Sequence, residues 1–183
     1  MQEEKVYREV PPDYKFERVF LPEDVFNQAR PAFIQECTDI IPINRQRRTL
    51  YLAPRISQPM AGWWWIGGRR YPGETKREAA KRNFNRETSL HFGEKQFENV
   101  SHHELLCLGI HYSIWTFAAE VSPDHVAYIS DHLDQKEYDR TKGLREFTRE
   151  QLIKERIHPS ILTFYDKIEN AVGWGIKYFP GGI

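Results

Sequence analysis

The chain has 183 residues and a mass of 21.8 kDa, which is enough for one domain with a core of ordinary size. Its 26 Lys and Arg residues balance 26 Asp and Glu residues, so there is no net positive field to attract a nucleic-acid backbone, and no DNA partner is expected. No apolar stretch is long enough to span a membrane and the first ten residues lack a signal core, so we expect a cytoplasmic protein without a membrane partner.

The two cysteines, Cys37 and Cys107, lie in apolar stretches and lack the spacing of metal ligands. We expect two buried thiols in a reducing compartment, although the sequence does not exclude a disulfide. The seven histidines show no ligand spacing either, so a zinc site is not expected.

Four segments are predicted in the first third of the chain. Residues 1–20 mix charges with prolines and show no clear period, which is typical of an N-terminal arm. Residues 22–30 begin with a proline followed by acids and end before another proline, which predicts a short helix. Residues 32–43 and 48–55 are rich in residues that favour strands, and a polar connector joins them, so they are predicted to form a hairpin.

The rest of the chain alternates between strands and helices. Residues 62–68 are predicted to be an aromatic strand that ends in a glycine pair. Thr75 and Glu78 have the spacing of a capping box, which predicts a helix over residues 76–90. Further predicted elements are strands at 100–110 and 112–122, a long polar loop at 122–142, a short strand at 143–147, and helices at 148–157 and 160–172. We therefore expect a single domain over residues 21–172 and a C-terminal tail over residues 173–183.

The segment "GGRRYPGETKREAAKRNFNRETSL", residues 67–90, has a specific spacing of glycine, acidic and basic residues. The order is Gly68, five residues, Glu74, seven residues, Arg82, four residues, Glu87. Glu74 lies just ahead of the predicted helix and Arg82 two turns inside it, so a bond between them would clamp the loop to the helix. Asn83 and Glu87 are four residues apart and share a helical face.

This segment resembles the Nudix box, whose pattern continues after the arginine with three glutamates and a glycine. Asn83, Arg86 and Ser89 depart from the pattern, in the places of two glutamates and the closing glycine. The resemblance implies an α/β fold with a mixed central β-sheet sandwiched between α-helices. It also implies hydrolysis of a nucleoside diphosphate linked to another group, with Gly68, Glu74 and Arg82 as the structural residues of the box.

The GDP-mannose mannosyl hydrolases likewise keep the box arginine and the last glutamate while replacing the other two glutamates. The segments "LPEDVFNQARP" and "APRISQPMAGWWWIGGRR", which precede the box and lead into it, are also similar to theirs. That resemblance implies Mg²⁺, or Mn²⁺, bound by the carbonyl of Gly67 and by Glu87, with Gln135 as a third ligand. Water then attacks the sugar carbon of a nucleotide sugar. The resemblance also implies a homodimer in which the N-terminal segment joins the contact.

The general base is the weakest part of this resemblance, because Lys136 stands where the family has a histidine. An ordinary lysine is protonated at neutral pH and is a poor base. Glu137 is the preferred substitute. The other candidates are Asp134, Asp139 and His132, and all of these residues are equally compatible with solvated loop charges.

Three arginines are candidates for contact with phosphate oxygens, because a guanidinium suits them. Arg69 follows the glycine pair and Arg55 ends the preceding strand. Arg86 either binds phosphate in place of a metal or pairs with Glu87 and silences the site.

The three tryptophans of the aromatic strand, Trp63, Trp64 and Trp65, are predicted to alternate across it. One face would pack in the core and the other could stack on a base or sugar.

Three functions remain open at this level. The first is hydrolysis of a nucleotide sugar, GDP-mannose-like, at the sugar carbon. The second is conventional Nudix cleavage of the P–O–P bond. The third is a non-catalytic domain that binds nucleotide, RNA or protein.

Overall fold

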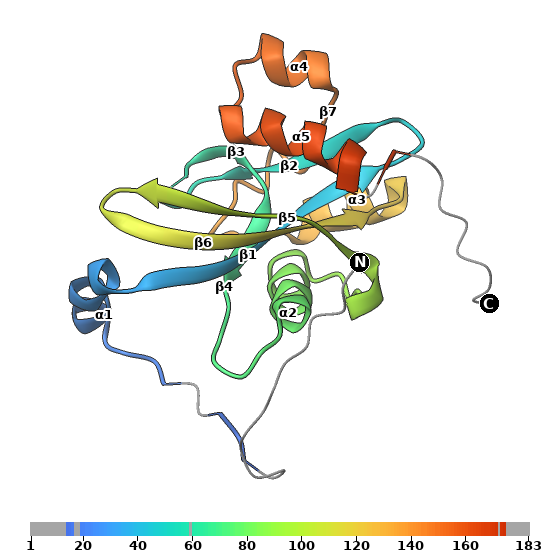
Figure 1. Ribbon diagram of the computed structural model, residues 1–183. Helices are drawn as coiled ribbons and strands as arrows, with labels where there is room; N and C mark the ends of the chain where they lie inside the picture. Colours follow the sequence, from blue (N-terminus) through green and yellow to red (C-terminus); the bar gives the residue numbers. More distant parts are fainter. Residues whose placement is uncertain (1–13, 17–18, 59, 172, 175–183) are drawn as a thin grey trace.

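The computed structural model describes residues 14–16, 19–58, 60–171 and 173–174. A seven-stranded mixed sheet runs through it, with helices on both sides (Figure 1). The strands are β1 (Ile34–Asn44), β2 (Thr49–Arg55), β3 (Gly62–Trp64), β4 (Ile66–Arg69), β5 (Phe97–Cys107), β6 (Ile110–Glu120) and β7 (Arg145–Phe147). The helices are α1 (Glu23–Ala29), α2 (Lys76–Thr88), α3 (Pro123–His132), α4 (Arg149–Lys154) and α5 (Pro159–Ala171), with short 3₁₀ turns at Arg30–Ala32 and Glu94–Gln96.

Strand β1 organises the sheet because three strands pair with it. The strand order is β3-β2-β1-β6-β5, with β4 also on β1 and β7 on β2. β1 is parallel to β6 and antiparallel to β2 and β4. Seven consecutive residues of β1, from Cys37 to Ile43, are buried, as expected for a strand covered on both faces.

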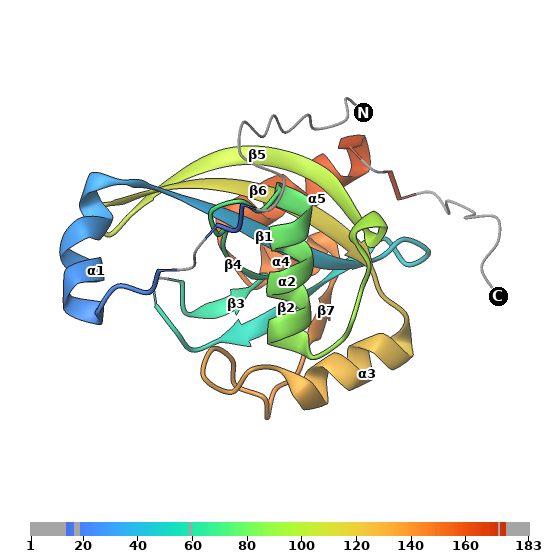
Figure 2. The ribbon, with the colours of Figure 1, turned by 90° about the horizontal axis from the view of Figure 1, so that it is seen from below.

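Two apolar cores lie on the two faces of the sheet. One includes Phe164 and Ile168 of α5, with α4 packed beside it. The other includes Ala80 and Phe84 of α2 and Ile129 of α3. Figure 2 shows α2 crossing the sheet and α3 beside it. The predicted fold class, a mixed sheet between helices, is therefore confirmed.

Most of the predicted elements are found within one or two residues of their expected bounds. This holds for the helices α1, α2 and α5, and for the hairpin that pairs Ile43 with Leu50. Helix α4 ends at Lys154 instead of residue 157, and β5 spans Phe97–Cys107 instead of residues 100–110. The predicted arm over residues 1–20 and tail over 173–183 lie largely outside the described residues.

The loop predicted over residues 122–142 is wrong in its first half, because α3 occupies Pro123–His132. Ser122 accepts a hydrogen bond from the backbone N–H of His125 at 3.2 Å, and the proline stands at the first turn. These are ordinary start signals of a helix, and Val126, Ile129 and Leu133 supply its apolar face. The polar composition of the segment concealed this short amphipathic pattern.

The expected alternation of the three tryptophans is also wrong. β3 ends at Trp64 and β4 begins at Ile66, so Trp65 lies at a break between two strands. Trp64 and Trp65 are both buried, although they are neighbours, and Trp63 packs edge-on against Phe147. All three rings therefore have packing partners, with Trp64 also reaching the pocket described below.

Both cysteines are free thiols, with Cys37 buried and Cys107 half-buried. Burial raises the pKa of the Cys37 thiol to about 12. Among the described helices, none combines the length and apolar character needed to cross a bilayer.

Candidate active site at the loop between β4 and α2

Helix α2 begins at a reciprocal cap and carries both apolar and polar residues into the interior. The Thr75 hydroxyl accepts from the backbone N–H of Glu78 at 3.1 Å, and the Glu78 carboxylate accepts from the backbone N–H of Thr75 at 2.6 Å. Phe84 packs in the core on the same helix that buries Asn83 and Glu87. The helix therefore brings two polar side chains under the preceding loop.

The loop is clamped to the helix by the pair expected from the spacing. Arg82 donates from Nε to Glu74 Oε1 at 2.6 Å and from Nη2 to Glu74 Oε2 at 2.7 Å. Its Nη2 also donates to the backbone carbonyl of Arg69 at 2.9 Å. A bidentate pair of this kind fixes geometry as well as charge.

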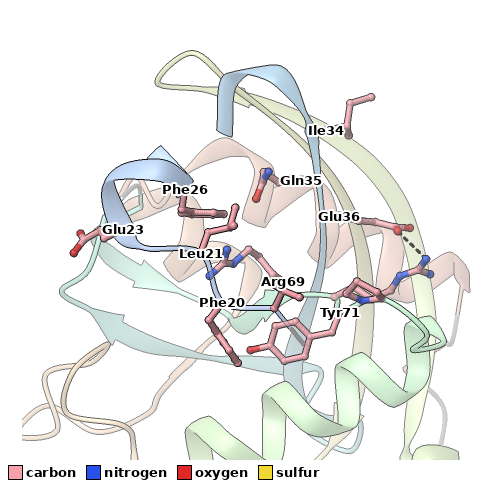
Figure 3. A pocket seen from close by; sticks show the side chains of 12 residues that line it. Phe20, Leu21, Glu23, Phe26, Ile34, Gln35, Glu36, Arg69 and Tyr71 are labelled. Carbon is pink, nitrogen blue, oxygen red and sulfur yellow. Dashed lines mark ion pairs between the residues drawn. The ribbon is translucent and has the colours of Figure 1, made fainter. Parts of the chain in front are cut away.

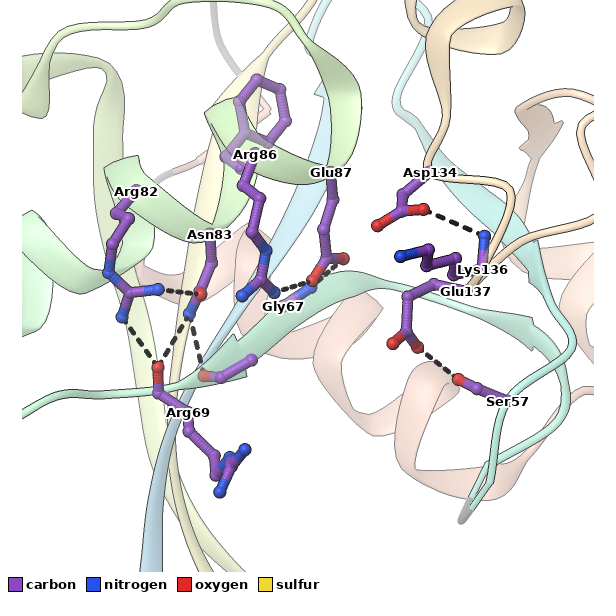
Figure 4. A network of polar contacts seen from close by, with 12 residues as sticks. Ser57, Gly67, Arg69, Arg82, Asn83, Arg86, Glu87, Asp134, Lys136 and Glu137 are labelled. Carbon is purple, nitrogen blue, oxygen red and sulfur yellow. Dashed lines mark hydrogen bonds and ion pairs between the residues drawn. The ribbon is translucent and has the colours of Figure 1, made fainter. Parts of the chain in front are cut away.

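Asn83 is fully buried and has a partner for each of its polar atoms. Its Nδ2 donates to Thr38 Oγ1 and to the carbonyl of Gly68, each at 2.9 Å, and its Oδ1 accepts from Arg82 at 2.7 Å. Asn83 therefore links α2 to β1 and β4 (Figure 4). An uncharged side chain thus holds the loop at the position where the box pattern has a glutamate.

Glu87 is only 2% exposed, and both of its carboxylate oxygens accept hydrogen bonds. Arg86 Nη2 lies 2.5 Å from Oε1, while the Tyr138 hydroxyl at 2.5 Å and the Gly67 N–H at 3.3 Å donate to Oε2. Burial raises the pKa of Glu87, and the bonds from Tyr138 and Arg86 oppose this rise. The carboxylate is thus enclosed by donors and faces away from open solvent.

The two glycines of the loop allow the close approach of three elements. A Cβ on Gly67 would lie 2.4 Å from Asp39 Oδ1 and 2.5 Å from the carbonyl of Thr38. A Cβ on Gly68 would lie 3.0 Å from Asn83 Oδ1 and 3.1 Å from Arg86 Nη2. Glycine is therefore required by space at Gly67, where the backbone of β1 is too close for a Cβ, whereas a Cβ on Gly68 would be tight and would push against side chains.

A pocket of about 470 Å³ opens over this network. The predicted site residues that line it are Arg55, Gly67, Gly68, Arg69, Arg86, Glu87, Asp134, Lys136 and Glu137. Gln135 is exposed and does not line the pocket, and neither do Asp139 and His132. The structure therefore brings the predicted basic residues together and leaves the predicted glutamine ligand aside.

Glu137 enters the pocket from the segment that follows α3. Its carboxylate accepts from the Ser57 hydroxyl and lies 3.4 Å from Arg55 Nη2. The backbone carbonyl of Glu137 accepts from the N–H of Ile56 at 2.8 Å, which fixes the segment to the end of β2. Glu137 is about one-third exposed, so it is both oriented and accessible.

Two residues of the site were missed by the sequence analysis, Asp39, which lines the pocket, and Tyr138, which lies behind Glu87 and does not line it. Tyr138 holds Glu87 from 51 positions away, and Asp39 of β1 is paired with Gly67 across the sheet. Burial raises the pKa of Asp39 to about 7, with Glu87 adding to the rise and Arg55 opposing it. No spacing rule joins these residues to the box, although Asp39 is marked in the sequence as a charge within a strongly apolar strand.

A larger adjoining pocket of about 730 Å³ lies between the N-terminal segment and the same loop (Figure 3). The two pockets share Phe26, Gln35, Arg69 and Tyr71. The Arg69 guanidinium lies 4.3 Å from the centre of the Phe26 ring. Arg69 therefore lies at the border of both pockets and lines each of them.

The residues as arranged do not fit the divalent metal that the resemblance implies. Glu87 is the last carboxylate of the box, and its oxygens are already occupied by Arg86, Tyr138 and Gly67. Within the described ranges, no group of three His, Cys, Asp or Glu side chains is placed to hold a metal ion. Mg²⁺ prefers several oxygen ligands in octahedral geometry, which this donor set does not offer.

Comparison with solved structures identifies the fold. No family model matches the chain, and no curated protein matches it in sequence. The chain is similar to a Nudix hydrolase from Nitrosomonas europaea, with 17% identity, 82% of this chain and 100% of that chain covered, and a TM-score of 0.57. It is similar to a MutT protein from Methanosarcina mazei Go1, with 16% identity, coverage of 75% and 94%, and a TM-score of 0.57. For the C. elegans Ap4A hydrolase the identity is 14%, the coverage 76% and 99%, and the TM-score 0.52. The chain therefore has the fold of the Nudix hydrolases.

Proposed function

We propose that this protein hydrolyses a nucleoside diphosphate linked to another group, and that the substrate is a nucleotide sugar, GDP-mannose-like. The observation that carries the proposal is the gathering of Arg55, Arg69, Arg86 and Lys136 around one pocket at the box loop, with the carboxylate of Glu137 in the same pocket. Guanidinium groups suit phosphate oxygens, and an oriented carboxylate suits proton removal from water. The similarity to hydrolases of the same fold supports the assignment to this reaction class.

Attack at the sugar carbon suits this site better than attack at phosphorus. In carbon attack, the water oxygen bonds to the sugar carbon, the bond from that carbon to the diphosphate oxygen breaks, and one water proton passes to Glu137. The nucleoside diphosphate leaves as an anion, and the basic side chains stabilise it. A sugar carbon tolerates positive charge in the transition state, so the water needs less activation. Of the three glutamate positions that follow the arginine in the box pattern, only Glu87 keeps a carboxylate, and hydrogen-bond donors enclose it. This disfavours the stronger activation of water that attack at phosphorus requires.

The test is turnover of a panel of nucleotide sugars and dinucleotides, with and without Mg²⁺, followed by phosphorus NMR of the products. We expect a nucleoside diphosphate and a free sugar from one member of the panel. Replacing the base, Glu137→Gln, is expected to lower kcat by ~100-fold or more. Glu104→Gln is the matched control, because Glu104 is an exposed carboxylate on β5 and does not line the pocket.

Two outcomes would point elsewhere. A nucleoside monophosphate and a sugar phosphate would establish conventional P–O–P cleavage. Absence of turnover across the panel, together with nucleotide binding, would establish a non-catalytic domain. Of these two alternatives, the direct contact of Arg86 with Glu87 favours the non-catalytic domain. Mn²⁺ in place of Mg²⁺ distinguishes a metal requirement from a specific need for Mg²⁺.

We also infer that two copies of the chain associate through the N-terminal segment and that the protein works in the cytoplasm. The described N-terminal residues support the first part, since several apolar side chains there are exposed. Its test is given with the whole molecule below.

A further inference from the structure

The contact between Arg86 and Glu87 is asymmetric with respect to the pocket. The Arg86 side chain is 47% exposed, whereas the Glu87 side chain is 2% exposed. A ligand entering the pocket therefore meets mainly the guanidinium, which lies beside the carboxylate (Figure 4). The face that this pair offers to a ligand is positive.

The position of the Arg86 guanidinium is fixed by the residues around it. A side chain on Gly68 would come within 3.1 Å of Arg86 Nη2, so the glycine leaves the room that this group occupies. Only Nη2 is bonded to Glu87, and within the described part of the chain the other donors of Arg86 have no protein partner. Arg86 is thus held on one side and has N–H groups left for a second anion.

The charges around the pocket favour an anion over a cation, because five basic side chains line it against four acidic ones. The basic ones are Arg30, Arg55, Arg69, Arg86 and Lys136, and the acidic ones are Asp39, Glu87, Asp134 and Glu137. Glu87 is neutralised by Arg86, and Glu137 lies against Arg55. Arg69 and Lys136 also line the pocket, and neither has an acidic partner among the residues described. Asn83, in the place of a second box carboxylate, is uncharged and fully bonded within the protein.

We propose that Arg86 takes the place of the divalent cation, so that this site binds a diphosphate through its guanidinium without a metal ion. Glu87 then acts as a positioning residue, because it holds Arg86 at the loop instead of ligating an ion. This inference rests on the proposed function only for the chemical class of the ligand, a nucleoside diphosphate.

The test is isothermal titration calorimetry with GDP, ADP and UDP, once in EDTA and once in excess MgCl₂. We expect at least one of these nucleotides to bind the wild-type chain with a Kd in EDTA within ~3-fold of the Kd in MgCl₂. In EDTA, Arg86→Ala is expected to raise the Kd by ~10-fold or more, because charge-assisted hydrogen bonds are lost. Arg77→Ala is the matched control, since Arg77 is an exposed arginine of the same helix and does not line the pocket.

A second variant separates positioning from metal ligation. Glu87→Gln keeps the shape of the side chain and removes its charge, so binding in EDTA is expected to persist and Mg²⁺ is expected to change it little. A loss of affinity in Glu87→Gln that is seen in MgCl₂ but not in EDTA would overturn the proposal, because it would mean that Glu87 ligates an ion. So would wild-type binding that requires Mg²⁺, an Arg86→Ala variant that binds normally in EDTA, or no binding by any of the three nucleotides.

The failure of this inference can be told apart from the failure of the proposed function. Arg86-dependent binding in EDTA without turnover of the substrate panel would leave the inference standing and remove the hydrolase. Turnover of the panel together with nucleotide binding that strictly requires Mg²⁺ would leave the hydrolase standing and remove the inference.

Discussion

At the scale of single residues, Asp39 is a buried carboxyl group of the pocket that is costly to ionise. Burial raises its pKa to about 7, whereas an aspartate in an unfolded chain has a pKa of ~4. Between these two values the folded state binds more protons than the unfolded state, so this group lowers the stability as the pH rises from ~4 to ~7. A buried charge of this kind is expected where it serves a ligand rather than the fold.

Replacing Asp39 by asparagine removes the free-energy cost of ionising this buried carboxyl group. We predict that Asp39→Asn raises the free energy of unfolding by ~2 kcal/mol or more at pH ~8 and has little effect at pH ~4. Denaturant titrations at the two pH values measure the difference. Asp131→Asn, on the exposed face of α3, serves as the control. An equal gain at both pH values would mean that the Asp39 carboxylate is not desolvated in the folded protein.

The sequence predicts much of the site because the box residues lie within one loop and one helix. Helical spacing placed Asn83, Glu87 and the pair of Glu74 with Arg82 correctly. It did not place Tyr138 on Glu87, because that contact joins segments 51 residues apart through the tertiary fold. Nor did it show whether Arg86 would turn towards Glu87 or towards solvent, since both directions are open to a long side chain on a helix surface.

At the scale of elements, the polar connector between β1 and β2 has an unexpected role. Arg45 in this turn is 1% exposed and binds three different partners. It contacts Glu98 of β5, donates to Glu120 of β6 at 3.1 Å, and donates to the carbonyl of Gly173 beyond α5 at 2.5 Å. One side chain of a turn that looks polar in sequence is therefore buried and joins the sheet to the end of the last helix, while residues 46–48 of the turn are exposed.

This junction gives a clear stability prediction. Arg45→Met is expected to lower the free energy of unfolding by ~3–5 kcal/mol, because it leaves the half-buried Glu98 without this charge partner. Arg149→Ala breaks an exposed pair with Asp166 and is expected to change little. Chemical denaturation of both variants makes the comparison. Equal effects would show that the Arg45 contacts add nothing beyond a surface pair.

At the scale of the whole molecule, exposed apolar side chains gather at the N-terminal part of the described chain. They include Val19, Phe20, Val25, Phe33 and Ile34, with exposed fractions between 43% and 75%. Exposed apolar groups clustered in this way favour association. The homodimer implied by the resemblance would use this segment, and the prediction of a dimer is still to be tested.

Light scattering at working concentration measures the association directly. We predict a dimer for the wild-type chain and a shift to monomer for Phe33→Glu, since a charge at a buried contact is unfavourable. Ile153→Glu is the control, because Ile153 is similarly exposed but lies on α4, apart from this segment. A wild-type monomer would remove the prediction.

The parallel pairing of β1 with β6 affects when the site can exist during synthesis. β1 leaves the ribosome early, but its parallel partner begins only at Ile110 and the tyrosine that holds Glu87 follows at position 138. Pairings between distant segments form slowly, and domains generally fold as units. Nascent or truncated chains that end before Tyr138 therefore contain the entire box but lack the completed pocket. Nucleotide affinity should consequently appear abruptly with chain length, as a late reporter of folding.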